Sequence, residues 1–153
     1  MSGIRLLRLR SDETEFAAWL DRGGSRHVSV IAREGTPASA WELRLDLPGV
    51  ARMATGGLPA GSRRVGPFEV RDRHQVRIEM PADSPFRAPL VKFVDPLFHP
   101  NVFPSGKLCW GIAEGDASWW RGGDGLGVLV ERILMIVSGD PQCTNPRSPA
   151  NPL

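Results

Sequence analysis

The sequence lacks any apolar run of the roughly 20 residues that a membrane-spanning helix needs. It also lacks, after Met1, the apolar stretch and small-residue cleavage site of a secretory signal. Cysteine is scarce: the two residues, Cys109 and Cys143, show no CxxC or Cys/His spacing. We therefore expect a cytoplasmic protein with reduced thiols, no structural zinc site or other metal, no cofactor and no membrane contact.

Lysine is scarce as well, because only two of the 19 basic residues are lysine and the rest are arginine. The arginines are scattered, and the net charge is only +2, so the chain lacks the basic patch of a nucleic-acid-binding protein. The preference for arginine is associated with GC-rich bacterial genomes and suggests a bacterial origin. The length of 153 residues predicts a single domain over residues 1–153.

Two segments have helical signals. Asp12 and Glu15 show the spacing of a capping box, apolar residues follow on one face and Gly23-Gly24 supplies a stop, which predicts a helix over residues 12–21. Residues 4–10 fit either an alternation or an extra helical turn and stay unassigned. Apolar residues repeat at helical spacing over residues 126–137, with Asp124 as the expected cap and Gly139 as the stop.

Between these helices the pattern changes to a two-residue alternation. Strands are expected over residues 28–32, 41–47 and 90–94, with a long connection over residues 48–67 and then one strand or two over residues 68–70 and 76–80. A segment rich in turn formers then precedes the second helix, and irregular segments of that length are usually functional. The order predicts an α+β domain, in which helices pack on one side of an antiparallel meander sheet.

The residues after the last strands form a recognisable signature. It consists of Ser84-Pro85-Phe86-Arg87-Ala88-Pro89, then Phe98-His99-Pro100-Asn101, then Cys109, and finally Asn145-Pro146-Arg147-Ser148-Pro149-Ala150-Asn151. His99 lies fifteen residues after Ser84, and Cys109 lies eight after Asn101. These segments and spacings resemble those of the ubiquitin-conjugating enzyme (UBC) superfamily.

The resemblance implies a UBC-like fold that lacks the usual two C-terminal helices, because the sequence ends at Leu153, where relatives begin them. It also implies a transferase that carries a ubiquitin-like protein as a thioester on Cys109. Asn101 would then stabilise the oxyanion when an amine attacks, and Ser148 would position that amine. His99 and Pro100 would form the scaffold of the active site.

Partners follow from the same resemblance. They are a ubiquitin-like modifier, an adenylating enzyme that activates it, a target amine and a JAB-type peptidase of the same bacterial pathway. The first helix with Arg5, Arg8 and Arg10 is the expected contact for the activating enzyme. Phe86 with the loop over residues 114–127 is the expected contact for a ligase. The residues identify neither the modifier nor the target.

Two other functions fit the residues. A catalytically silent UBC-fold module would bind a ubiquitin-like protein or a partner, although such modules characteristically lack the cysteine that this chain has. A cysteine hydrolase would use Cys109 with His27, His74 or His99 as the base, but the sequence shows no surrounding hydrolase motif. Cys143, which lacks a partner motif, is interpreted as structural.

Overall fold

The computed structural model describes residues 3–109 and 121–139. Its elements are two α-helices, a short 3₁₀ helix and five strands, in the following order: α1 (Gly3–Asp21), η1 (Gly24–Arg26), β1 (Val28–Glu34), β2 (Ala40–Met53), β3 (Ser62–Val65), β4 (Phe68–Glu79), β5 (Leu90–Phe93) and α2 (Leu126–Ser138). In this part of the chain, no helix is long and apolar enough to cross a membrane.

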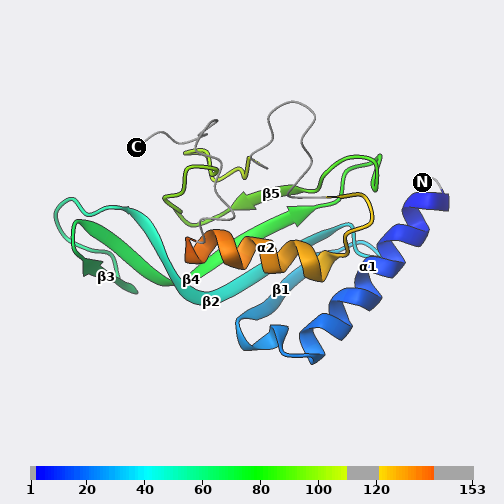
Figure 1. Cartoon of the computed structure of the whole chain (residues 1–153), viewed down its shortest axis with the longest axis horizontal. Coiled ribbons are helices and arrows are strands. Elements are labelled where there is room, and N and C mark those ends of the chain that lie inside the picture. The colour runs from blue at the N-terminus through cyan, green and yellow to red at the C-terminus, as the bar shows by residue number, and fades with distance from the viewer. Residues whose placement is uncertain (1–2, 110–120, 140–153) are drawn as a thin grey trace.

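The five strands form one antiparallel sheet in the order β1-β2-β4, with β3 and β5 pairing with opposite ends of β4. Alternation along β2 buries Trp41, Leu43 and Leu45 on one face and leaves charged residues on the other. α2 lies across the buried face and α1 lies beside α2 (Figure 1). The expected α+β architecture is confirmed.

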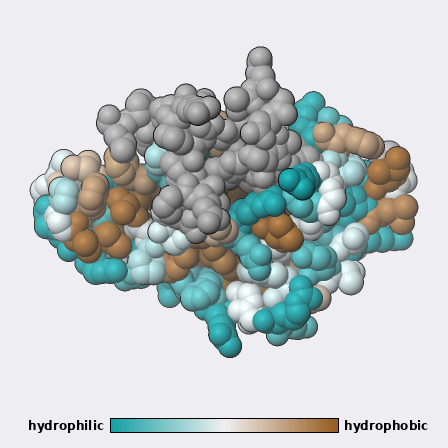
Figure 2. All heavy atoms as spheres, viewed as in Figure 1, coloured by the Kyte–Doolittle hydropathy of each residue, from teal (hydrophilic) through white to brown (hydrophobic). Residues whose placement is uncertain are grey.

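The hydropathy of the surface varies along the long axis of the molecule (Figure 2). Brown, apolar patches lie at its two ends, one near the turn between β2 and β3 and the other near the amino end of α1. Large apolar side chains exposed at these ends are Met53 and Val65 at one and Ile4 and Leu7 at the other. Such scattered apolar residues are ordinary on a protein surface.

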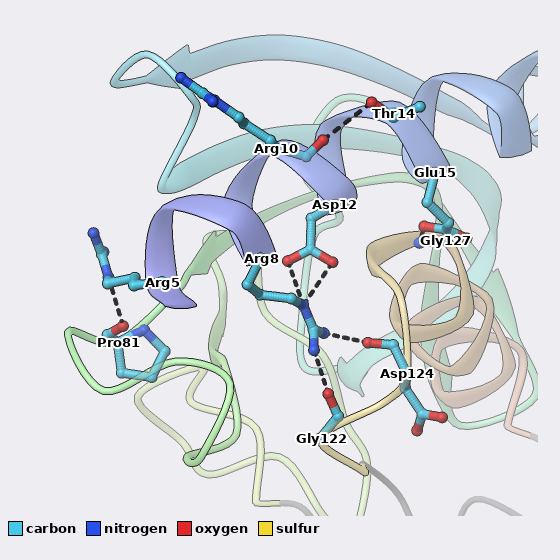
Figure 3. A network of polar contacts seen from close by, with 10 residues as sticks. All are labelled: Arg5, Arg8, Arg10, Asp12, Thr14, Glu15, Pro81, Gly122, Asp124 and Gly127. Carbon is cyan, nitrogen blue, oxygen red and sulfur yellow. Dashed lines mark hydrogen bonds and ion pairs between the residues drawn. The ribbon is translucent and has the colours of Figure 1, made fainter. Parts of the chain in front are cut away.

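The first helix starts earlier than the sequence indicated. α1 begins at Gly3, so Asp12 is not its cap but an interior residue, 2% exposed and paired with Arg8 (Figure 3). The buried stripe of Leu9, Asp12, Phe16 and Trp19 keeps helical spacing, which settles the ambiguous segment 4–10 in favour of a helix.

The expected long connection over residues 48–67 is wrong. β2 continues past Pro48 through a bulge near Gly49, and β3 pairs with β4 through a tight turn. A bulge tolerates proline because its residue need not donate to the ladder. Gly49 fits because a Cβ there would lie 2.8 Å from both the His74 ring and Val137. Of the two possibilities left open for residues 68–80, the structure has one continuous strand, β4.

The second helix has the expected position but another cap. Gly125 is its N-cap and makes no side-chain hydrogen bond, while Asp124 accepts from the Arg121 N–H and pairs with Arg132. The cap comes from α1, because Glu15 Oε2 accepts the Gly127 N–H at 2.7 Å (Figure 3). At the other end, Gly139 in the left-handed conformation (φ 76°) ends the helix as expected.

Replacing Glu15 tests this cap. Glu15→Ala is expected to lower the free energy of unfolding by about 1–2 kcal/mol, because the first turn of α2 loses a charged acceptor. Glu15→Gln, which keeps an oxygen acceptor without the charge, should lose less. Urea denaturation of the three proteins measures the difference, and equal stability of Glu15→Ala and the parent would show that the bond contributes nothing.

Candidate active site

The histidine of the His-Pro-Asn tripeptide fixes a buried turn after β5. The Asn101 N–H donates to His99 Nδ1 at 3.0 Å, and the Val102 N–H donates to the His99 carbonyl at 3.0 Å. His99 is 4% exposed and Asn101 is fully buried. The preceding Phe98 N–H donates to the Val50 carbonyl of β2 at 2.7 Å, which ties the turn to the sheet.

Cys109 is held beside Asn101 by a short hairpin-like return of the chain. Val102 and Leu108 form a bridge, and the Cys109 N–H donates to the Asn101 carbonyl at 2.7 Å. Leu108, 3% exposed, is anchored in the core, whereas Cys109 is half-buried and a free thiol. Neighbouring residues of an extended segment alternate in direction, so Cys109 lies on the outer side of this segment.

Gly106 makes this return possible, and sequence reasoning missed it. Its φ is +91°, and a Cβ would lie 2.1 Å from the Phe93 carbonyl oxygen. The backbones approach closely because the Phe93 N–H donates to the Gly106 carbonyl at 2.7 Å. The run Pro104-Ser105-Gly106 is a turn signal that could have revealed this position.

The environment of His99 suits a scaffold rather than a base. Burial lowers the pKa of the His99 imidazole to about 4. A ring this weakly basic is neutral at ordinary pH, and its Nδ1 already accepts the Asn101 N–H. An efficient general base instead has a pKa near the working pH. This geometry favours the scaffold role over proton transfer.

The lowered pKa predicts an acid-sensitive fold. Unfolded His99 would bind a proton below about pH 6.5, and the folded ring only near pH 4, so its contribution to stability is complete above pH 6.5 and is lost as the pH falls toward 4. The expected loss is at most roughly 3 kcal/mol, since each pKa unit corresponds to about 1.4 kcal/mol.

Denaturant midpoints measured across this pH range check the expectation. His99→Asn, which offers an oxygen acceptor but does not titrate, should flatten the dependence between pH 6.5 and about 4. Glutamates titrate at the lower end of this window, and burial also lowers the pKa of His74, so the quantity to compare is the difference between His99→Asn and the parent protein. An unchanged slope in His99→Asn would contradict the assignment.

Among the described residues, no contact brings either of the other histidines to Cys109. His74 is fully buried in the sheet, its Nε2 contacts the Arg71 carbonyl, and burial lowers the pKa of its imidazole. Its Nδ1 has no hydrogen-bond partner among the described residues. His27 is exposed between η1 and β1, where its Nδ1 contacts the Asp46 carbonyl.

The residues expected to bind partners differ in their availability. Phe86 is 77% exposed on the turn that leads to β5. Arg5 instead donates to the Pro81 and Met80 carbonyls, and Arg8 pairs with Asp12 and donates to the Gly122 and Asp124 carbonyls (Figure 3). Both arginines therefore hold α1 to neighbouring segments, and a contact with an activating enzyme stays a prediction.

Several expected features lie outside the described residues. They are Cys143 and the segment 145–151 with Ser148. Within residues 3–109 and 121–139, no cluster of histidine, cysteine or carboxylate side chains could hold a metal ion.

Comparison with known proteins identifies the family. Residues 64–152, more than half of the chain, match the family described as "Ubiquitin-conjugating enzyme". The chain belongs to the ubiquitin-conjugating enzyme family. The matched region contains Asn101 and Cys109 as well as the segment with Ser148.

Individual members of the ubiquitin-conjugating enzyme family agree with this assignment. The chain is 33% identical over 76 residues to the Sumo-conjugating enzyme ubc9 of Dictyostelium discoideum, an alignment that covers 50% of this chain and 45% of that protein. The match thus spans less than half the length of that curated relative. The structure of human ubiquitin-conjugating enzyme E2 G1 superposes with a TM-score of 0.58 at 20% identity, covering 88% of this chain and 94% of the other, which shows a shared fold.

Proposed function

We propose that this chain accepts an activated ubiquitin-like protein as a thioester on Cys109 and transfers it to an amine, such as a lysine, of a target. The observation that supports the proposal is the 2.7 Å bond between the Cys109 N–H and the Asn101 carbonyl, since it joins the backbones of the two residues that carry the half-buried thiol and the expected oxyanion donor. Family membership supports conjugation of a ubiquitin-like protein as the general reaction.

Each residue has a defined part in this reaction. Cys109 is the nucleophile that receives the acyl group. The Asn101 side-chain amide donates to the oxyanion that forms when the amine attacks. His99 Nδ1 accepts the backbone N–H of Asn101 and so holds that residue in place. Pro100 restricts the turn between the two residues. Ser148 positions the incoming amine.

The proposal also names the partners. They are the ubiquitin-like modifier, an adenylating enzyme that loads it, a target protein and, in a bacterial setting, a JAB-type peptidase. Phe86 is offered as the ligase contact because it is a large apolar side chain with most of its surface exposed. The proposed reaction needs no metal or cofactor on this chain. The chain would act as a single domain, in the cytoplasm.

Enzymatic loading tests the proposal. The protein is incubated with ATP, a candidate modifier and an activating enzyme shown to be charged, and adducts are separated on non-reducing gels. We expect an adduct that a thiol reagent removes, that Cys109→Ala abolishes and that the matched variant Cys143→Ala retains. Absence of any adduct on the parent protein would contradict the transferase and favour the binding module.

A further inference from the structure

The only two lysines of the sequence lie opposite each other. Lys92 of β5 and Lys107 form an antiparallel bridge. The hydrogen bonds flank this pair, because the Phe93 N–H donates to the Gly106 carbonyl and the Leu108 N–H to the Val91 carbonyl. It is therefore a non-hydrogen-bonded pair, in which the Cα atoms approach to about 4.5 Å and the side chains are closest.

This pairing of two positive charges is expected to destabilise the fold, and no ion pair among the described residues offsets it. Like charges directly opposite on neighbouring strands are destabilising. Every ion pair found in the described residues uses arginine, and neither lysine takes part in one. The nearby Glu79 is paired with Arg77. Both lysines are exposed, so their amines are accessible.

The lysines line a groove of about 340 Å³ on the outer side of the sheet. Its other walls are formed by Arg77, Glu79, Leu90, Val91 and Ser105. Lys107 points to the same side of its segment as Cys109, because the buried Leu108 stands between them. Two residues of extended chain span roughly 6–7 Å, a distance that the flexible four-carbon stem of lysine can cover.

We infer that Lys107 is an acceptor for the acyl group carried by Cys109, so that the chain modifies itself. The inference rests on the proposed function. The deprotonated Lys107 amine attacks the thioester carbonyl, a C–N bond forms and the C–S bond breaks. Cys109 leaves as a thiolate, the proton of the amine passes to solvent or to the thiolate, and no oxidant or reductant is needed. The product is an isopeptide-linked form with Cys109 restored.

Chemical loading tests this step without an activating enzyme. The full chain carrying Cys143→Ala is acylated on Cys109 with a synthetic peptide thioester that ends in glycine, and excess reagent is removed. In mildly alkaline buffer, we expect the thiol-sensitive adduct to become thiol-resistant, with mass spectrometry of peptides locating the acyl group on Lys107. Proximity should make this transfer at least about tenfold faster than in Lys107→Arg.

Matched variants separate the amine from its charge. Lys107→Arg keeps the positive charge but cannot accept the acyl group. Lys92→Arg makes the same change on the neighbouring strand. We expect Lys92→Arg to change the rate of acyl transfer to Lys107 by less than about twofold. Cys109→Ala should leave Lys107 unmodified. Transfer that is unchanged in Lys107→Arg, acylation of Lys107 that persists in Cys109→Ala, or hydrolysis without acylation of Lys107 would each overturn the inference.

The two proposals fail in different experiments. If the activating enzyme and modifier form no thioester on the parent protein, the proposed function fails. If the chemically formed thioester on Cys109 never reaches Lys107, only the self-modification fails. The chemically formed thioester therefore shows whether Lys107 accepts the acyl group, whatever the outcome of enzymatic loading.

Discussion

Gly106→Ala is expected to lower the free energy of unfolding by about 3–5 kcal/mol, near the upper end for single substitutions. Two costs add at this position. A side chain is disfavoured at φ +91°, and its Cβ would lie 2.1 Å from the Phe93 carbonyl oxygen, which is backbone and cannot swing away. Relief requires the segment that carries Cys109 to move from β5, so loading of Cys109 should fall as well.

Two other glycines serve as matched controls for Gly106. Gly61 has a φ of +81° with nothing near its Cβ position, so Gly61→Ala isolates the backbone cost of about 1–2 kcal/mol. Gly57 has neither a positive φ nor a neighbour within 4 Å, so Gly57→Ala should stay within about 0.5 kcal/mol of the parent. Urea denaturation measures all three, and a Gly106→Ala protein as stable as Gly61→Ala would refute the close approach.

Asn101→Ala should slow discharge of the loaded protein to an amine by roughly 100-fold or more, the usual effect of removing one oxyanion donor. Loading itself should persist. The bonds that place Cys109 use the backbone of Asn101, whose N–H donates to His99 and whose carbonyl accepts from Cys109, and alanine retains both groups.

The measurement is a single-turnover chase, in which the isolated thioester is mixed with excess free lysine and the remaining adduct is followed on non-reducing gels. Thermal denaturation of Asn101→Ala checks that the variant is folded. His99→Asn serves as a comparison that disturbs the same turn but keeps the Asn101 amide. Discharge of Asn101→Ala at the parent rate would remove the oxyanion role from this side chain.

Local patterns predicted the first half of β2 and the second helix. The alternation over residues 41–47 and the helical spacing over residues 126–137 each match an observed element. The spacing between Asn101 and Cys109 also fits the site, because a short return of the chain brings the two residues together. These features depend on neighbouring residues, which sequence periodicity reports directly.

Features that depend on distant residues could not be predicted from local patterns. The cap of α2 comes from Glu15, 112 residues before the N–H that it accepts. The continuation of β2 past Pro48 depends on a bulge whose glycine packs under His74. The early start of α1 is fixed by tertiary packing of Leu9, since residues 4–10 alone fit two periods.

The most direct test of the role of Cys109 replaces its sulfur by oxygen. Cys109→Ser, incubated with ATP, the modifier and its activating enzyme, should form an adduct that resists thiol reagents but is cleaved by alkali, because an oxygen ester replaces the thioester. Intact-mass spectrometry identifies one added modifier, and peptide mapping should place it on residue 109. A thiol-sensitive adduct that persists in Cys109→Ser would show that another residue carries the modifier and would contradict the role assigned to Cys109.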